Sequence, residues 1–257
     1  MIKGGGSHAD TVERQFGDRA GAYLSSSVHA EGDDLRSLAD LLASRQDGRL
    51  LDMGCGAGHA SFIAAGCVAD VTAYDLSQSM LDIVQRAAHD RGLSNITTRQ
   101  GVVESLPFTD GAFDVVISRY SAHHWRDAGL ALREASRVLK SGGLAVFMDV
   151  ASPGYPVYDI YLQTVEMLRD TSHVRDYSPG EWLSMLTEAG LTVRATTAGR
   201  LRLEFQSWIE RMRTPDHFSA AIRALQQSVS DDTIRYYAIE GDGSFTVDTV
   251  MVTALKP

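Results

Sequence analysis

Cysteine and positive charge are both scarce in this chain of 257 residues. Its two cysteines, Cys55 and Cys67, lack the spacing of a disulfide framework or a zinc site, which is typical of a reducing compartment. Lys and Arg number 24 against 33 Asp and Glu, and the resulting net charge of -9 would repel a phosphate backbone. We therefore expect no nucleic-acid partner, and a small molecule as the substrate.

Long hydrophobic runs are missing as well. The first eight residues contain no apolar core of a signal peptide, and no segment is apolar over the length that a membrane span requires. Hydrophobic residues nevertheless make up 44% of the chain and are spread along nearly all of it, so that a large core can be buried. We expect a cytoplasmic protein with no membrane partner, either a monomer or a homodimer.

Short apolar runs alternate with longer amphipathic stretches from Leu50 onward, a pattern typical of strand-helix units and a parallel sheet. The expected strands span residues 49–53, 68–74, 96–100, 113–118, 143–150, 192–197 and 245–254. The expected helices span residues 10–26, 33–44, 57–65, 77–91, 130–139, 157–169, 179–189, 207–212 and 218–227. The pattern predicts an α/β fold with a Rossmann-like, doubly wound, mostly parallel sheet of seven strands.

The sequence pattern differs on either side of the region of alternating strands and helices. Helical periodicity precedes the first strand, and after Asp149 the prolines Pro153 and Pro156 interrupt the strand-helix alternation. We therefore divide the chain into an N-terminal tail with lid helices (1–46), a ligand-binding Rossmann-like core (47–152), and helical cap insertions that are followed by the last strands (153–257).

A glycine-rich turn is the strongest motif. Residues 51–58 read LDMGCGAG, so a buried strand ends in three alternating glycines before a helix. Glycine lets the backbone turn sharply and lets a ligand approach without meeting a side chain. A dinucleotide fingerprint requires a wider spacing before its third glycine, and the acidic Asp52 suits a ligand with a cationic amino-acid end better than one with two phosphates.

A second acidic residue follows at a suitable distance. Asp75 ends the next strand, about twenty residues after the first glycine, where a carboxylate can accept both hydroxyls of a ribose. Alternatively, Asp75 caps the helix that starts near Ser77. The glycine turn and Asp75 together predict a nucleoside site.

These motifs resemble the class I S-adenosylmethionine-dependent methyltransferases, in particular the branch of the ubiquinone and menaquinone C-methyltransferases. The resemblance runs from about Phe16 to the C-terminus. It rests on the motifs LDMGCGAG (51–58), YDLS (74–77) followed by Met80 and Leu81, ESLPF (104–108) and LKSGG (139–143). It implies methyl transfer from S-adenosyl-L-methionine to a small-molecule acceptor.

The resemblance also implies a set of cofactor-binding residues. Asp75 would hold the ribose, and Leu76 and Met80 would pack against the adenine. The usual adenine-binding Asp is replaced by Val102, so that Val103 or Glu104 would take its part, although Glu104 could equally be a surface or helix-start charge. The methionine end would be lined by Asp52, Gly54, Cys55 and Gly56, its ammonium group by the carbonyls of Ser118 and Arg119, and its carboxylate by a lid with Tyr23 and His29.

Two adjacent histidines follow the fourth strand, at the edge of the sheet where ligands bind. His123 or His124 could act as the catalytic base, or one could pack under the next helix while the other stays in solvent. A metal site would need a third ligand, which the sequence does not reveal, so no metal is expected. In the cap, residues 172–175 and 208–213 could line an acceptor pocket or simply pack.

Three alternatives remain open. A nicotinamide-dependent oxidoreductase would share the doubly wound sheet, but the glycine spacing is against it and no Tyr-x-x-x-Lys pair is found. A sensor that binds S-adenosylmethionine without turnover would keep the same site. A nucleic-acid methyltransferase is disfavoured because the chain has no basic run and carries SRYS (118–121) where such enzymes have an Asn/Asp-Pro-Pro-Tyr motif.

Overall fold

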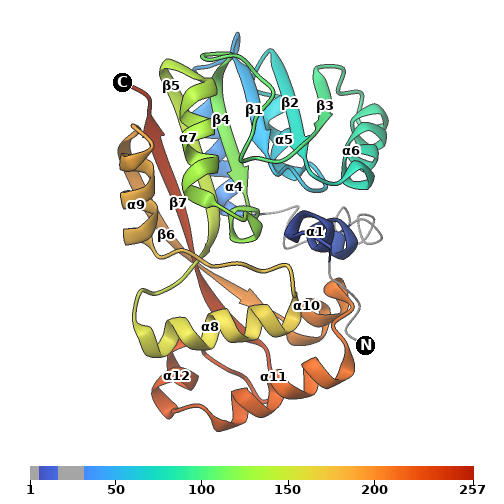
Figure 1. Cartoon of the computed structure of the whole chain (residues 1–257), viewed down its shortest axis with the longest axis vertical. Helices are drawn as coiled ribbons and strands as arrows, with labels where there is room; N and C mark the ends of the chain where they lie inside the picture. Colours follow the sequence, from blue (N-terminus) through green and yellow to red (C-terminus); the bar gives the residue numbers. More distant parts are fainter. Residues whose placement is uncertain (1–5, 17–31) are drawn as a thin grey trace.

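The computed structural model describes residues 6–16 and 32–257, and its centre is a sheet of seven strands in the order β3-β2-β1-β4-β5-β7-β6 (Figure 1). Strands β1 to β5 are parallel, and β7 runs antiparallel to both of its neighbours. The strands are β1 (Arg49–Met53), β2 (Asp70–Asp75), β3 (Ile96–Gln100), β4 (Phe113–Arg119), β5 (Leu139–Ala151), β6 (Thr192–Leu203) and β7 (Phe245–Leu255). The sheet therefore has the predicted number of strands and the predicted mostly parallel, doubly wound arrangement.

Helices cover both faces of the sheet because successive side chains of its strands point to opposite faces. Leu50 packs in the hydrophobic cluster under α4 and α5, whereas its neighbour Leu51 packs in the cluster under α7 and α9. The helices that flank the sheet are α4 (Asp33–Leu42), α5 (His59–Ala65), α6 (Gln78–Asp90), α7 (Ala128–Val138) and α9 (Pro179–Glu188). Burial on both faces explains why the central strands β1 and β4 are mostly apolar, whereas the edge strands β3 and β6 are more polar and exposed.

A helical cap lies below the sheet in Figure 1, around the end of β6 and the beginning of β7. It has a hydrophobic cluster of its own, in which Tyr161, Trp208, Tyr237 and Phe245 are almost fully buried. Its helices are α8 (Pro156–Arg169), α10 (Phe205–Met212), α11 (Asp216–Ser228) and α12 (Asp231–Tyr236). Strands β6 and β7 of the sheet thus continue into the cap. The division of the chain at residues 46 and 152 stays a prediction.

Some boundaries differ from the expected ones. β1 and β3 have the expected limits, but β6 extends to Leu203 instead of residue 197. Residues 194–200 of β6 are all exposed, which interrupts the hydrophobic alternation before it resumes at Leu201 and Leu203. The first helix, α1 (His8–Phe16), begins two residues earlier than expected, and its expected continuation lies outside the described residues.

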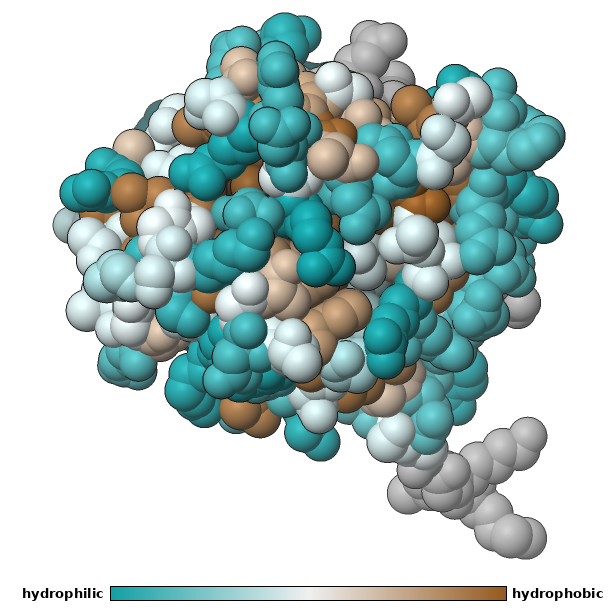
Figure 2. All heavy atoms as spheres, turned by 90° about the horizontal axis from the view of Figure 1, so that it is seen from above, coloured by the Kyte–Doolittle hydropathy of each residue, from teal (hydrophilic) through white to brown (hydrophobic). Residues whose placement is uncertain are grey.

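The surface agrees with the composition. The face shown in Figure 2 is mostly hydrophilic, and its hydrophobic residues are scattered in small patches. Within residues 6–16 and 32–257, none of the helices has the length and apolar character that crossing a membrane requires.

Candidate active site

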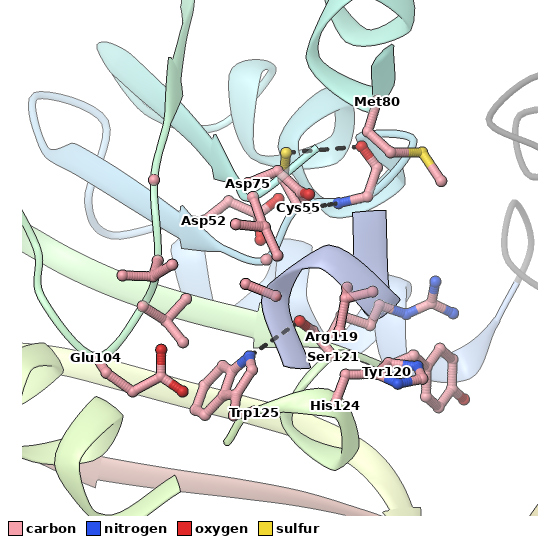
Figure 3. Close-up of a pocket in the computed structure, with 18 of the residues that line it drawn as sticks. Asp52, Cys55, Asp75, Met80, Glu104, Arg119, Tyr120, Ser121, His124 and Trp125 are labelled. Atoms are coloured by element: carbon pink, nitrogen blue, oxygen red, sulfur yellow. Dashed lines mark hydrogen bonds between the residues drawn. The ribbon is translucent and has the colours of Figure 1, made fainter. Parts of the chain in front are cut away.

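A cavity of about 280 Å³ lies at the carboxyl ends of β1, β2 and β4. Its wall combines the glycine turn after β1, the segment after β3, the segment after β4, and helix α1, which crosses in front of it in Figure 3. The lining residues are Ser7, His8, Ala9, Val12, Asp52, Gly54, Cys55, Gly56, Ala57, His59, Ala60, Asp75, Leu76, Met80, Gly101, Val102, Val103, Glu104, Arg119, Tyr120, Ser121, His124, Trp125 and Arg126. Residues far apart in the sequence thus surround one hollow.

The glycine turn requires glycine for two different reasons. Gly54 has φ +68°, and a Cβ there would lie 1.9 Å from the hydroxyl oxygen of Ser121, so the turn and the segment after β4 approach too closely for a side chain. Gly56 has φ +51°, but a Cβ there would meet no atom within 4 Å. Since Gly56 lines the cavity, its missing side chain leaves space for a ligand.

The Asp75 carboxylate lies beside this turn. Its Oδ2 accepts the backbone N–H of Gly56 at 2.8 Å, and its Oδ1 accepts the N–H of Ser77 at 2.9 Å. Burial raises the pKa of Asp75 above its ordinary value, although these N–H groups oppose the shift. Ser77, whose side chain accepts the N–H of Met80, is the cap of α6. Asp75 therefore fixes the glycine turn and keeps lone pairs for a ligand in the cavity.

The Asp52 carboxylate is almost fully buried and only half satisfied. Its Oδ2 accepts the hydroxyl of Ser61 at 2.6 Å, whereas its Oδ1 has no hydrogen-bond partner. Burial raises the pKa of Asp52 to about 7, and the nearby Asp75 adds to the shift. Because an unpartnered buried carboxylate oxygen is costly, Asp52, which lines the cavity, is suited to a cationic or hydrogen-bond-donating ligand.

Cys55, between the two glycines, also lines the cavity. Burial raises the pKa of its thiol well above the ordinary value, and the two nearby carboxylates act in the same direction. The side chain is therefore a neutral thiol that contributes apolar surface.

Another part of the cavity wall is largely apolar. Met80, Leu76 and Val103 line it together with the backbone of Gly101. Glu104 lines it as well, and its Oε1 accepts the N–H of the α7 cap residue Asp127 at 3.3 Å. Glu104 thus lines the cavity and also holds the segment before α7, and its contact with the adenine stays a prediction.

Two cofactor-binding candidates at the end of β4 have strong partners within the protein. Ser118 is buried and does not line the cavity, and its hydroxyl donates to the carbonyl of Met53 at 2.7 Å. Arg119 lines the cavity, and its guanidinium donates to both oxygens of Asp34 on α4, at 2.5 and 3.1 Å. The next residue, Tyr120, has φ +50°, a strained conformation that is typical of functional sites.

The two histidines lie in the short 3-10 helix η2 (Ala122–His124) and have different surroundings. His124 lines the cavity, and its Nδ1 lies 3.2 Å from the carbonyl oxygen of Ser172. Burial and the neighbouring His123 lower the pKa of His124. His123 does not line the cavity; its Nδ1 lies 2.6 Å from Asp149 Oδ1. Burial opposes a charge on His123, but the Asp149 carboxylate outweighs it and raises the pKa of this imidazole to about 9.

Helix α1 covers the cavity, and the sequence did not single out the residues that hold it there. His8 Nε2 donates to the carbonyl oxygen of His124 at 2.8 Å, and Gln15 donates to Asp170 Oδ1 at 2.9 Å. Tyr23 and His29, the expected lid residues, lie outside the described part of the chain. The helical periodicity indicated a lid, but no local signal identified His8 or Gln15 as its contacts.

The cap candidates have structural partners. Trp208 is 2% exposed in the cap core, where Arg169 packs over its ring. Of residues 172–175, Ser172 places its Oγ 3.3 Å from His124 Nδ1, while Arg175 pairs with Asp159 and Glu181. These residues do not line the cavity, so their role in an acceptor pocket stays a prediction.

The fold, the glycine turn and the paired carboxylates define the class of the Rossmann-like methyltransferases, and comparisons with known proteins agree. The methyltransferase domain family matches residues 51–147. The uncharacterized protein YafE of Escherichia coli is 58% identical over 203 residues, which cover 79% of this chain and 98% of that protein. The uncharacterized methyltransferase YcgJ of Bacillus subtilis is 36% identical over 251 residues, which cover 96% and 99%.

Solved structures give the same result. The crystal structure of YcgJ superposes with a TM-score of 0.83 at 31% identity, covering 87% of this chain and 98% of that one. A putative methyltransferase from Bacillus halodurans superposes with a TM-score of 0.84 at 29% identity, covering 88% and 100%. The chain belongs to this family of class I methyltransferases and is an S-adenosylmethionine-dependent methyltransferase. The fold and activity predicted from the sequence are confirmed, and the oxidoreductase alternative is wrong.

Proposed function

We propose that this enzyme methylates a small molecule, with the cofactor held across the glycine turn and the acceptor bound beside His124 under helix α1. The observation that carries the proposal is the cavity itself, in which the free oxygen of Asp52 and the side-chain-free Gly56 lie near Asp75. When bound, S-adenosylmethionine supplies a methyl group that its sulfonium already activates. The protein then has to bind the cofactor and the acceptor, orient them toward each other, and exclude water.

The residues present fit this cofactor. Asp75 has lone pairs available for two ribose hydroxyls, and Asp52 Oδ1 is available to an ammonium group. Met80, Leu76 and Val103 offer an apolar surface to the adenine. In Figure 3, Asp52 and Asp75 lie on one side of the cavity, and Trp125, His124 and Tyr120 lie on the other, which leaves that side to the acceptor.

An acceptor panel tests the proposal. We expect S-adenosylhomocysteine to form with small aromatic or enolic acceptors and not with RNA, DNA or protein, because the cavity is narrow and the net charge of -9 disfavours polyanions. Turnover with a macromolecule alone would contradict a small-molecule acceptor. Cofactor binding without turnover on any acceptor would favour a sensor.

The affinity for the cofactor should increase as the pH rises, because Asp52 loses its proton. The raised pKa of about 7 means that this carboxyl is mostly protonated at pH 6 and mostly ionised at pH 8. An ammonium group binds the ionised form, so we expect affinity about tenfold higher at pH 8 than at pH 6. Calorimetry on the wild type and on Asp52→Asn checks this. The affinity of the variant should depend much less on pH. An unchanged dependence of affinity on pH would mean that Asp52 does not contact the ammonium group.

His124→Ala should impair turnover more than cofactor binding. The imidazole lines the proposed acceptor side, where its loss would leave the acceptor badly oriented; we expect kcat to fall about 10- to 100-fold and the cofactor Kd to change less than about twofold. His89→Ala, in an exposed histidine of α6, is the matched control and should match the wild type. A parallel loss of kcat and cofactor affinity would assign His124 a packing role instead.

A further inference from the structure

A second polar cluster lies outside the cavity, where the core meets the cap. His123 of η2, Asp149 of β5 and Asp176, which follows α8, each offer one ligand atom, and these three atoms all lie within 4.8 Å of one another. Asp149 and Asp176 are 3% and 1% exposed. The three residues come from different segments of the chain and point their polar atoms at one shared space.

One atom of this cluster has no partner. Asp176 Oδ2 is buried and accepts no hydrogen bond, and the nearest imidazole nitrogen outside the trio, His173 Nε2, lies 3.9 Å away and contacts Gln163 instead. Burial and the neighbouring Glu166 raise the pKa of Asp176 well above its ordinary value. Since an unpartnered buried carboxylate is costly, this oxygen requires either a proton or a cation.

The charges of the trio point to a divalent cation. Asp149 and Asp176 together carry two negative charges when ionised, and protonated His123 would neutralise only one of them. A divalent ion bound by a neutral imidazole and two carboxylates would balance the charge and give Asp176 Oδ2 its missing partner.

We propose that His123, Asp149 and Asp176 bind one divalent transition-metal ion, with zinc as the best match. Tetrahedral zinc ligands lie about 2.0 to 2.2 Å from the ion, so their donor atoms are about 3.3 to 3.6 Å apart. Atoms that lie within 4.8 Å of one another would therefore have to approach by at most about 1.5 Å. A mixed imidazole and carboxylate set favours zinc over calcium or magnesium, which prefer oxygen alone. Binding takes the place of the His123–Asp149 hydrogen bond and releases the imidazole proton.

The site would tie the cap to the core beside the cavity. The carbonyl oxygen of His123 already accepts the N–H groups of Val174 and Arg175, at 2.8 and 3.3 Å, so the cap segment lies against η2. The rings of His123 and His124 are 4.3 Å apart. A metal on His123 would therefore act as a structural clamp that holds the cavity-lining His124 in position.

Zinc titration of the whole chain tests the site. After dialysis against a chelator, calorimetry with zinc chloride should show one ion per chain in the wild type. Asp176→Asn should weaken zinc binding by about 100-fold or more, since even changes to groups around metal ligands cost 10- to 100-fold. Zinc should also raise the Tm of the wild type and not that of the variant. Magnesium chloride in the same titration should bind far more weakly.

The matched control is Asp159→Asn. Asp159 is a carboxylate of the same cap, on α8, but it pairs with Ser152, Gln163 and Arg175 and lies outside the trio. Its variant should bind zinc within about threefold of the wild type. Anomalous scattering at the zinc edge from wild-type crystals locates the ion even if Asp176→Asn does not fold. Absence of stoichiometric zinc, zinc at another site, or equal affinity in Asp176→Asn and the wild type would overturn the proposal.

Discussion

Replacing Asp75 with alanine is expected to weaken S-adenosylmethionine binding by about 100-fold to 10,000-fold. Two hydrogen bonds from ribose hydroxyls to a carboxylate contribute about 1.5 to 3 kcal/mol each, and every 1.4 kcal/mol corresponds to about tenfold in affinity. The loss should be large because the Asp75 carboxylate is partly buried and lines the cavity. Calorimetric titration with the cofactor measures the change directly.

The same substitution removes two contacts within the protein. Asp75 accepts the N–H groups of Gly56 and Ser77, so its loss should also lower the free energy of unfolding by about 1 to 3 kcal/mol. Asp114→Ala is a matched control, because Asp114 accepts the N–H of Arg49 at 3.0 Å and pairs with Lys140 away from the cavity. The control should lose stability and keep its cofactor affinity. Wild-type affinity in Asp75→Ala, or an equal loss in Asp114→Ala, would contradict a ribose contact.

The parts of this site that the sequence predicted are local in the chain. The glycine turn and Asp75 follow two adjacent strands, and Gly56 and Asp75 are 19 positions apart. Parallel neighbouring strands end at the same edge of the sheet, so this spacing is sufficient to bring them together. β1 and β3 were likewise predicted with their limits, because each is a short stretch between turns that depends on local sequence.

The parts that the sequence did not predict depend on contacts between distant segments. His8 donates to His124 across 116 positions, and Gln15 reaches Asp170 across 155. Asp149 reaches His123 from β5, and Asp176 reaches it only because the cap segment lies against η2. A search for metal ligands at regular spacing therefore found none, since these three residues belong to three separate elements.

Strand β6 shows a different limit of sequence interpretation. It pairs only with β7 at the edge of the sheet, and its residues up to Gly199 are largely exposed. Period-two alternation arises when one face is buried, so an exposed edge strand carries little of it. Helix α12 has only six residues, too few for a helical period to stand out. The sequence therefore predicted a β6 that was too short, and it did not predict α12.

Gly56→Val is expected to abolish measurable cofactor binding. Its Cβ would extend into the cavity, where no protein atom lies within 4 Å, and the two methyl groups would fill the space beside Asp75 and Asp52. The substitution also forces a β-branched residue into φ +51°, which should cost about 1 to 2 kcal/mol of stability. Calorimetry and urea unfolding measure the two effects separately.

Gly142→Val separates the lost space from the backbone strain. Gly142 has φ +75°, and a Cβ there would also meet no atom within 4 Å, but it does not line the cavity. Both variants should therefore lose similar stability, while only Gly56→Val loses the cofactor. Normal binding by Gly56→Val would mean that the cofactor does not approach this turn, and a matching loss in Gly142→Val would mean that strain alone disrupts the site. Because one substitution fills the cavity and the other leaves it open, the pair tests the proposed position of the cofactor independently of fold stability.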